Sequence, residues 1–346
     1  MSILKKNFCI QKLNTFGIMV YAHYFLTIQN IKDLHNLHRL GNLYPKIPKL
    51  FLGNGSNILF INNYYPGILV KMGISGKKVI YEKNNKVIVK AYGGENWNDL
   101  VSWTIKKGFS GLENLSHIPG TVGAAPIQNI GAYGTEIKDV LLEVKVYEIN
   151  QKKFIIFSKN ECKLKYRSSF FKQHTKYSIN QFLIVSVSFL LRTKYHNINT
   201  SYLEVQQELE NMKIKRPTIN DLSLAIYNIR TRKLPNPKEI GNAGSFFKNP
   251  IIDKLKFNKL KDQYPTIKGI TFSKQQTKVS ASSLIEIIGW KGKKIGNVGS
   301  YEKQPIILVN YGNASGKEIY CFSKEIIQNI KTKFNITLSL EVDIIK

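Results

Sequence analysis

The chain has 346 residues, of which 43% are hydrophobic and 11% aromatic, a composition that excludes wholesale disorder and favours more than one packed domain. Three widely separated cysteines without a CxxC pair exclude a disulfide scaffold and a structural zinc site, and are typical of a reducing compartment. The formal net charge is +28, yet the 51 basic residues are spread evenly and include only six arginines. Nucleic-acid readers favour clustered arginine, so we attribute the charge to composition and expect no specific nucleic-acid partner.

No apolar run approaches the length that crosses a bilayer, and the first residues lack a signal-peptide pattern. We therefore expect a cytoplasmic protein with no membrane partner, and we expect a monomer. The six histidines show no ligand spacing, so no metal site is predicted.

Hydrophobic patterns in the first half of the chain predict strands mixed with helices. One helix is predicted over residues 31–40 with an end at Gly41, and another over 97–105 with an end at Gly108. The Asn-Asn pair at 84–85 between two apolar runs predicts a hairpin. Strands are predicted at residues 18–21, 50–52, 58–61, 79–81, 87–92, 144–149, 154–157 and 184–191.

The second half begins with a predicted helix over residues 221–231, followed by the proline-marked segment LPNPK at 234–238, which predicts a domain boundary. Beyond it the patterns predict helices at 282–288 and 317–333 and strands at 306–310 and 336–344. Strands and helices mixed without regular βαβ spacing favour an α+β fold.

The segment LGNGSNILF, residues 52–60, is predicted to lie between two strands. Its glycines Gly53 and Gly55 allow backbone N–H groups to approach a ligand closely, and Ser56 and Asn57 add side-chain partners. Such a nest suits a pyrophosphate, but the pattern is not a dinucleotide-binding fingerprint, because no third glycine and no helix follow. On this segment alone, a tight turn between strands is the favoured reading.

Residues 111–134, which we call the glycine-rich loop, combine five glycines with three alanines and two prolines. So many small residues do not make a stable helix or strand, and a loop of this length is usually functional. Its composition indicates close backbone approach to a flat, extended ligand. The alternative is a buried crossover, to which we give less weight.

Residues 241–250, GNAGSFFKNP, form what we call the serine segment. Ser245 is flanked by Gly244 on one side and by Phe246 and Phe247 on the other, which predicts an exposed hydroxyl beside an apolar wall. The pattern is not the GxSxG elbow of hydrolases. The alternative is a serine that caps a turn.

Two further polar residues are candidates. Arg167 in YRSSFFK is one of only six arginines and could hold a carboxylate in a planar fork, the alternative being a surface ion pair. Glu341 lies in the predicted final strand, on the face opposite Leu338 and Val342, which most often is solvent.

Together these segments resemble one family, the UDP-N-acetylenolpyruvoylglucosamine reductases. The resemblance starts at NTFGI (14–18) and GGENW (93–97), includes KLPNPK and all the segments above, and covers nearly the whole chain in order. It implies an α+β protein of three domains, with an FAD-binding fold of the vanillyl-alcohol-oxidase/PCMH type and a C-terminal substrate-binding α+β domain. The implied domains are residues 1–70 with the final strand 336–346 returning to it, 71–232, and 233–335.

The resemblance also implies an activity. Family members are NADPH-dependent flavoproteins with FAD that convert UDP-N-acetylglucosamine enolpyruvate to UDP-N-acetylmuramate in peptidoglycan precursor synthesis. Hydride passes from flavin N5 to C3 of the enolpyruvyl group. By family position, Ser245 gives the proton to C2, while Arg167 and Glu341 stabilise the enolate, and fixed positive donors suit that role.

The family positions further imply binding residues. Contacts to FAD are implied for Gly53, Asn54, Gly55, Ser56, Asn57, Ile118, Pro119, Gly120, Gly123, Ala124, Ile127, Gly131, Ala132 and Tyr133. Contacts to the substrate are implied for Tyr202, Lys233, Asn249 and Gln304, with Tyr202 in an insertion that resembles the subclass whose tyrosine folds over the nucleotide. Two positions depart from the family pattern: Leu340 replaces a proline, and Ser168 replaces an acidic or amide residue.

Three other readings stay open. A flavin fold with a different substrate would not need the set Arg167, Ser245 and Glu341. A lysine-rich RNA-binding protein would need a clustered basic face and stacking aromatics, which the even charge distribution opposes. A decayed, inactive enzyme is opposed by the intact site residues.

Overall fold

The computed structural model describes residues 4–43, 46–175 and 181–346 and divides into two compact units. The first unit comprises Met1–Phe8, Ala22–Asn54 and Pro66–Arg232, and the second comprises Cys9–Tyr21, Gly55–Tyr65 and Lys233–Lys346. Each unit is therefore assembled from stretches that are distant in sequence. The last junction lies immediately before the proline-marked segment at 234–238. The division of the chain into three domains stays a prediction.

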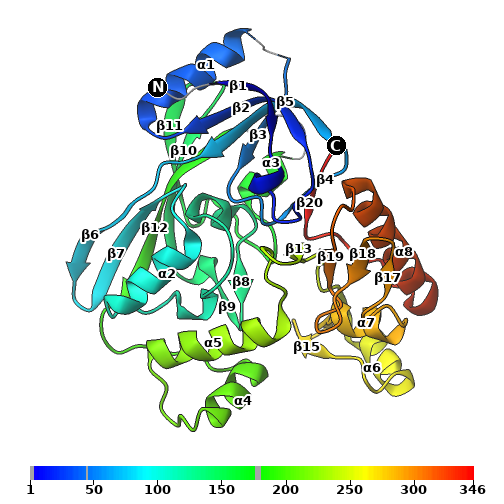
Figure 1. Ribbon diagram of the computed structural model, residues 1–346. Coiled ribbons are helices and arrows are strands. Elements are labelled where there is room, and N and C mark those ends of the chain that lie inside the picture. Colours follow the sequence, from blue (N-terminus) through cyan, green and yellow to red (C-terminus); the bar gives the residue numbers. More distant parts are fainter. Residues whose placement is uncertain (1–3, 44–45, 176–180) are drawn as a thin grey trace. The chain divides into compact units, whose positions relative to one another are not determined.

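Two sheets dominate the first unit (Figure 1). A four-stranded sheet has the order β1 (Lys5–Cys9), β2 (Tyr21–Ile28), β5 (Tyr64–Met72) and β3 (Lys49–Leu52), with β3 parallel to β5. A five-stranded antiparallel sheet has the order β11 (Lys153–Ser158), β10 (Leu141–Glu148), β12 (Phe182–Arg192), β7 (Lys86–Tyr92) and β6 (Lys77–Lys83). The helices are α1 (Leu34–Leu43), α2 (Trp97–Lys106), α3 (Phe170–Thr175), α4 (Leu203–Asn211) and α5 (Ile219–Lys233), and β8 (Gly131–Ala132) pairs with β9 (Thr135–Glu136).

Local sequence signals explain the best-predicted elements of this unit. Asn84 and Asn85 adopt φ values of 52° and 61° between β6 and β7, which is the left-handed pair that a tight hairpin turn requires. Helix α2 starts at the cap Asn96, buries the apolar stripe that the sequence predicts, and is followed by Gly108 with φ of 73°. The indole of Trp97 donates to the Leu115 carbonyl at 2.9 Å, so α2 also anchors the glycine-rich loop.

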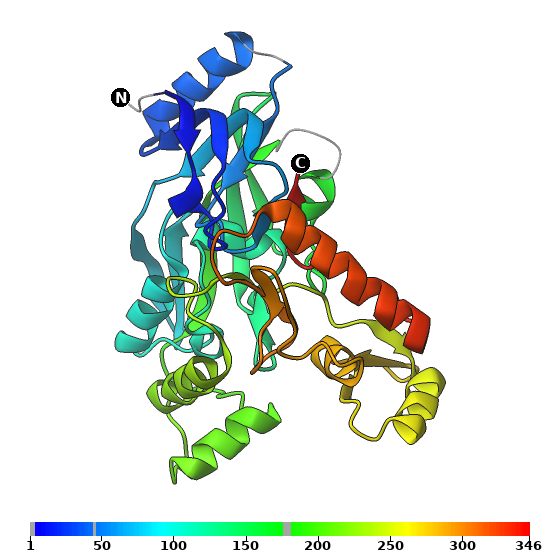
Figure 2. The same cartoon turned by 45° about the vertical axis from the view of Figure 1, so that its right-hand side comes forward.

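The second unit contains smaller sheets and three helices. Its strands are β13 (Gly241–Ser245), β19 (Ile307–Asn310), β18 (Val298–Ser300) and β17 (Lys294–Ile295) in one sheet, β14 (Ile251–Asp253), β16 (Gln276–Val279) and β15 (Gly269–Thr271) in another, and the parallel pair β4 (Ile58–Phe60) and β20 (Asp343–Ile345). The helices are α6 (Lys254–Gln263), α7 (Ala281–Ile287) and α8 (Gly316–Phe334). The long α8, orange-red in Figure 2, lies beside β18 and β19, and its ends are fixed by a capping box at Ser315 and a left-handed Asn335.

Some predicted elements have other bounds. The strand predicted at 18–21 begins at Tyr21 and continues to Ile28, and the first helix does not stop at Gly41 but extends to Leu43. The final strand predicted over 336–344 is reduced to β20, because the preceding residues bond to the serine segment instead of forming a ladder. Elements without a local signature, such as β1, β5 and α6, were not predicted.

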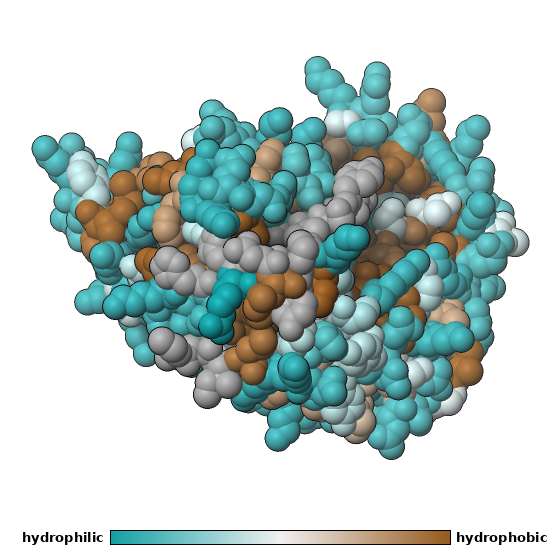
Figure 3. Space-filling view, turned by 90° about the horizontal axis from the view of Figure 1, so that it is seen from above, coloured by the Kyte–Doolittle hydropathy of each residue, from teal (hydrophilic) through white to brown (hydrophobic). Residues whose placement is uncertain are grey.

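The surface of the described residues carries both hydrophilic and hydrophobic side chains. The face drawn in Figure 3 is mainly hydrophilic, with hydrophobic side chains in separate patches. Within residues 4–43, 46–175 and 181–346, no helix combines the length and the apolar character needed to cross a membrane.

Candidate active site

The segment LGNGSNILF, which we call the nest, turns between strands β3 and β4, as the sequence predicts. These two strands do not pair with each other, because β3 pairs with β5 and β4 pairs with β20. Between Asn54 and Gly55 the chain passes from the first unit to the second. In the first unit, Asn54 Nδ2 donates to the Gly120 carbonyl at 3.1 Å, and a Cβ on Gly53 would lie 2.6 Å from Thr121 Oγ1. Gly53 and Asn54 therefore pack directly against the glycine-rich loop.

The glycine-rich loop is an ordered platform of tight turns rather than a helix or a sheet. Its short helical turns cover Glu113–Leu115 and Val122–Ile127, and large apolar residues beneath them, such as Leu112 and Leu115, are buried in the core. Asn129 is fully buried, donates to Glu136 and to the Lys165 carbonyl, and accepts from the Lys138 N–H. These bonds fix the end of the loop.

The exposed side of this platform suits a flat ligand. Residues with small or apolar side chains remain half-exposed there, namely Ile118, Gly123, Ala124, Ile127, Gly131 and Ala132. Gly120 has φ of 141°, which favours glycine, and a Cβ on Gly123 would lie 2.9 Å from the Gly93 carbonyl oxygen. The half-exposed glycines and alanines of this face therefore fit the FAD that the sequence predicts.

Arg167 is attached to the same platform. Its φ of 51° is unusual for a residue with a side chain, and its Nη2 donates to the Gly131 carbonyl at 3.0 Å. Two residues further on, Ser169 Oγ donates to the Ile127 carbonyl at 2.5 Å. The YRSS segment is therefore bound to the loop at two points, and the guanidinium is held by backbone.

Two tyrosines predicted to bind ligands meet in the first unit. The rings of Tyr133 and Tyr202 lie edge to face with centroids 5.5 Å apart, and Tyr202 immediately precedes α4. Burial, with a smaller contribution from Glu204, raises the pKa of Tyr202 to about 12. Both phenols therefore stay neutral at physiological pH and can act as hydrogen-bond donors.

Sequence reasoning missed a residue beside this pair. Arg230 on α5 is half-buried, and burial lowers the pKa of this arginine, while its positive charge opposes the rise that burial causes in the pKa of Tyr133. Burial, followed by the positive charge of Arg230, also lowers the pKa of His117. The rarity that singled out Arg167 could have singled out Arg230 as well, since both belong to the same six arginines.

In the second unit, the NTFGI segment holds distant stretches together. The buried Asn14 accepts from the Ile18 N–H and donates to two backbone carbonyls, which closes the turn on itself. Thr15 N–H donates to the Gly55 carbonyl at 3.1 Å, and the Thr15 carbonyl accepts from Asn242 N–H at 3.0 Å. This turn therefore connects the nest to the start of the serine segment.

In the second unit, the backbone of Glu341 is hydrogen-bonded to the residue that follows Ser245. Ser245 is exposed at the end of β13, while Phe246 and Phe247 are fully buried, as the sequence predicts. The Glu341 N–H donates to the Phe246 carbonyl at 2.9 Å. Glu341 is only 8% exposed, so the expectation of a solvent-facing position is wrong: the predicted strand alternation does not exist there.

The end of the nest fixes this arrangement from the other side. Asn57 Nδ2 donates to the Glu341 carbonyl at 3.1 Å, and the Asn57 carbonyl accepts from the Asp343 N–H at 3.0 Å. The backbone of Glu341 is therefore held between Asn57 and Phe246, two residues that the sequence separates by nearly 190 positions.

The remaining predicted substrate residues also lie in the second unit. Asn249 Oδ1 accepts from the Ala281 N–H at 2.9 Å, and Gln304 Oε1 accepts from Ser282 Oγ at 3.2 Å. Both side chains thus meet at the first turn of α7, although they are distant in sequence. Lys233, the last residue of α5, is half-buried.

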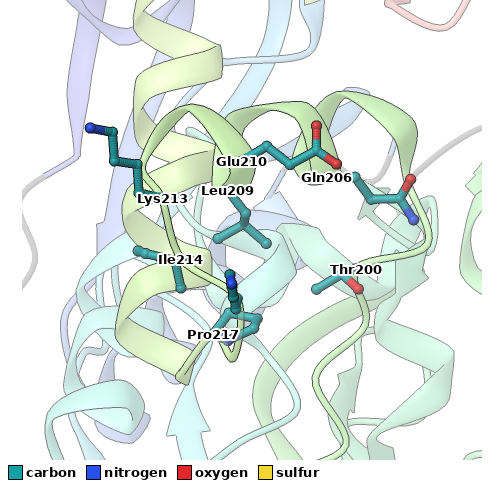
Figure 4. A pocket seen from close by; sticks show the side chains of 8 residues that line it. Thr200, Gln206, Leu209, Glu210, Lys213, Ile214 and Pro217 are labelled. Carbon is teal, nitrogen blue, oxygen red and sulfur yellow. The ribbon is translucent and has the colours of Figure 1, made fainter.

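A cavity of about 550 Å³ lies elsewhere, between α4 and the connection to α5 (Figure 4). Its lining residues are Thr200, Gln206, Leu209, Glu210, Lys213, Ile214, Lys215 and Pro217, and none of them is a predicted site residue. Among the described residues, no group of three or more His, Cys, Asp or Glu side chains could hold a metal ion.

Comparison with known proteins decides the family. Residues 236–345 match the model of the UDP-N-acetylenolpyruvoylglucosamine reductase C-terminal domain, and residues 22–150 match an FAD binding domain. The chain is 41% identical to the UDP-N-acetylenolpyruvoylglucosamine reductase of Flavobacterium johnsoniae over 342 residues, covering 99% of both chains, and 43% identical to that of Buchnera aphidicola over 337 residues, covering 97% of this chain and 98% of the relative. The chain belongs to the UDP-N-acetylenolpyruvoylglucosamine reductase family.

The fold agrees with that of a solved relative. The crystal structure of UDP-N-acetylenolpyruvylglucosamine reductase from Thermus caldophilus is similar with a TM-score of 0.67 and 21% identity, covering all of both chains. The predicted family and fold class, a flavin-binding α+β fold with an added C-terminal domain, are confirmed. Membership in this family also makes the chain an FAD-dependent oxidoreductase.

Proposed function

We propose that this chain reduces UDP-N-acetylglucosamine enolpyruvate to UDP-N-acetylmuramate, with NADPH as the reductant. The observation that carries the proposal is the serine segment: Ser245 is exposed beside two buried phenylalanines, and the backbone of Glu341 is bonded directly to it. A hydroxyl and a carboxylate on adjoining backbone suit proton delivery to a carbon atom.

FAD, when bound, supplies the hydride transfer that connects NADPH to the enolpyruvyl group. The chain's part is to hold the cofactor along the glycine-rich loop and the nest, through the residues that the family positions imply. The support is the set of half-exposed small or apolar residues between Ile118 and Ala132, together with the lack of a side chain at Gly120 and Gly123.

The catalytic roles are divided among three residues. Arg167, fixed on the Gly131 carbonyl, is proposed to stabilise negative charge on the substrate carboxylate as the enolate forms. Ser245 is proposed to give the proton to C2, and Glu341 to stabilise the same enolate. Tyr202, Lys233, Asn249 and Gln304 are proposed to bind the nucleotide and sugar.

An anaerobic titration of the holoprotein tests the proposal. Adding NADPH should bleach the flavin absorbance, and adding UDP-N-acetylglucosamine enolpyruvate should restore it, with UDP-N-acetylmuramate formed in equal amount. Absorbance that bleaches but returns only with oxygen would contradict the proposed substrate, and protein that cannot be loaded with FAD would contradict the proposal as a whole.

A further inference from the structure

Asn129, near the end of the glycine-rich loop, is fully buried and uses every hydrogen-bonding group of its side chain. Its Nδ2 donates to Glu136 Oε2 at 2.9 Å and to the Lys165 carbonyl at 3.2 Å, and its Oδ1 accepts from the Lys138 N–H at 3.1 Å. A side-chain amide has two N–H donors, so both are occupied. A buried amide that is fully bonded in this way fixes the positions of the groups around it.

The Lys165 carbonyl lies at the base of the tight turn that carries Arg167. Lys165 and Ser168 exchange two backbone hydrogen bonds, of 3.0 and 3.1 Å. The two residues between them, Tyr166 and Arg167, form the turn. The Lys165 carbonyl therefore accepts from the Ser168 N–H and from Asn129 Nδ2 together, and Asn129 is bonded to the turn itself.

A second hydrogen bond joins the same two segments with the same spacing. Arg167 Nη2 donates to the Gly131 carbonyl at 3.0 Å. Gly131 follows Asn129 by two residues, and Arg167 follows Lys165 by the same number. One bond thus runs from the loop to the turn and the other from the turn to the loop. Two bonds with this spacing fix both the position of the turn along the loop and its orientation.

The backbone conformation explains why an asparagine occupies this position. Asn129 and Arg167 have φ values of 48° and 51°, the left-handed conformation that few residues with side chains adopt. Asparagine is among the residues that visit this conformation most readily. Glycine would tolerate the same backbone but could donate no side-chain hydrogen bond. Asparagine therefore combines the required backbone with the bond to the Lys165 carbonyl.

We propose that Asn129 is a positioning residue for the reaction: it holds the turn so that the Arg167 guanidinium meets the negative charge that develops on the substrate. The inference rests on the proposed function, which assigns that charge to Arg167. Fixed donors are effective only where the charge develops, and a displacement of about 1 Å can slow a reaction about 10²-fold. The alternative is that Asn129 only supports the loop face that holds FAD, since Ile127 and Gly131 are its near neighbours.

The test follows both half-reactions of the FAD-loaded enzyme by anaerobic rapid mixing. Asn129→Gly tolerates the left-handed backbone and removes the amide, and Asn84→Gly makes the same replacement at a φ of 52° in the exposed hairpin turn. Reoxidation by UDP-N-acetylglucosamine enolpyruvate uses Arg167 in the proposed mechanism, whereas reduction by NADPH does not. The rate of reduction is therefore the internal control for the loop face that holds FAD.

Asn129→Gly should keep the rate of reduction within about twofold of the wild type and slow reoxidation about 10-fold. Asn84→Gly should change neither rate by more than about twofold. An Arg167→Met enzyme has no guanidinium left to position, so adding Asn129→Gly to it should slow reoxidation by less than about twofold further. If Asn129→Gly does not retain FAD, Asn129→Asp keeps the side-chain size and an acceptor, loses both donors, and should also slow reoxidation alone.

Three other results would overturn the inference. Equal slowing of both half-reactions, or loss of FAD in both Asn129 variants, would assign Asn129 to the loop face that holds FAD. Slowing that multiplies with that of Arg167→Met would mean that Asn129 acts independently of the guanidinium, and unchanged reoxidation would leave Asn129 without a part in the reaction. If the reduced wild-type enzyme is not reoxidised by the substrate, the proposed function fails and the inference with it. Any of the three results in an enzyme whose wild type is reoxidised overturns only the inference.

Discussion

The glycine-rich loop of the first unit and the serine segment of the second both depend on glycine, but for different physical reasons. In the loop, a Cβ on Gly123 would approach the Gly93 carbonyl to 2.9 Å, and one on Gly131 would approach Glu136 Cγ to 2.7 Å. In the serine segment, a Cβ on Gly244 would meet nothing within 4 Å, and glycine is favoured there by its φ of 68°.

This difference distinguishes a loop whose backbone forms a surface from a segment that exposes one side chain, Ser245. The loop is packed against its own surroundings, so its glycines allow the backbone to form a close-packed surface for a ligand. Gly244 precedes the exposed Ser245, and the strand register of β13 against β19 shifts between Asn242 and Ser245. Similar composition therefore produces a close-packed backbone surface in one unit and an exposed side chain in the other.

The largest effect outside the serine itself is expected at Arg167, which the platform holds. Arg167→Lys removes the planar fork that contacts Gly131, so substrate-dependent reoxidation of the reduced enzyme should slow about 100-fold. Rapid-mixing kinetics measure this step, with Arg192→Lys at an exposed position as the control. A reoxidation rate equal to that of the wild type would remove Arg167 from the catalytic set.

Two glycine variants in the serine segment compare the loss of stability caused by a steric clash with the loss caused by an unfavourable backbone conformation. A Cβ on Gly241 would lie 2.2 Å from the Phe16 carbonyl oxygen, so Gly241→Ala should destabilise the protein by about 3 kcal/mol or more. Gly244→Ala meets open space and should cost only about 1–2 kcal/mol from its left-handed backbone. Urea unfolding measures both, and equal losses would contradict the distinction between the two sites.

A pH-dependent effect is expected in the helical pair α4 and α5, which follows Tyr202. Hydrogen bonds from Arg232 lower the pKa of Glu208 in the folded protein, so its stabilisation is fully present above the unfolded pKa of about 4.3 and is lost as pH falls through the lowered folded value. At pH 7, Glu208→Gln should reduce the free energy of unfolding by about 1–3 kcal/mol. The difference in free energy of unfolding between this variant and the wild type should become smaller in acid.

The control for this prediction is Glu286→Gln. Glu286 pairs with Lys291 at an exposed site, so its loss should cost less than about 1 kcal/mol. A Glu208→Gln penalty that persists unchanged in acid would show that the carboxylate's charge is not what connects α4 to α5.

Sequence predicted the elements whose signals are local. The hairpin at Asn84 and Asn85 and the buried stripe of α2 depend on neighbouring residues only, and the structure confirms both. The pairing of β20 with β4 joins residues nearly 285 positions apart, so no local pattern reports it. The same distance explains Glu341: alternation predicted a strand and a solvent-facing side chain, whereas its N–H bonds to Phe246 and its side chain is buried.

The site residues, too, could be predicted only where the signal lies in neighbouring residues. Ser245 was predicted because glycine and phenylalanine beside it report its exposure directly. Arg230 was missed because an arginine on a helix next to other basic residues is typical of a solvated face, whereas Arg230 is half-buried and only Arg232 is exposed.

The central claim that we propose is that the glycine-rich loop and the nest hold the flavin while the serine segment delivers the proton. The most direct test is anaerobic rapid mixing of Ser245→Ala, in which both half-reactions are followed by flavin absorbance. We predict that reduction by NADPH keeps nearly the wild-type rate, while reoxidation by UDP-N-acetylglucosamine enolpyruvate slows by about 10²–10⁴-fold. Equal slowing of both half-reactions, or reoxidation at the wild-type rate, would contradict the account.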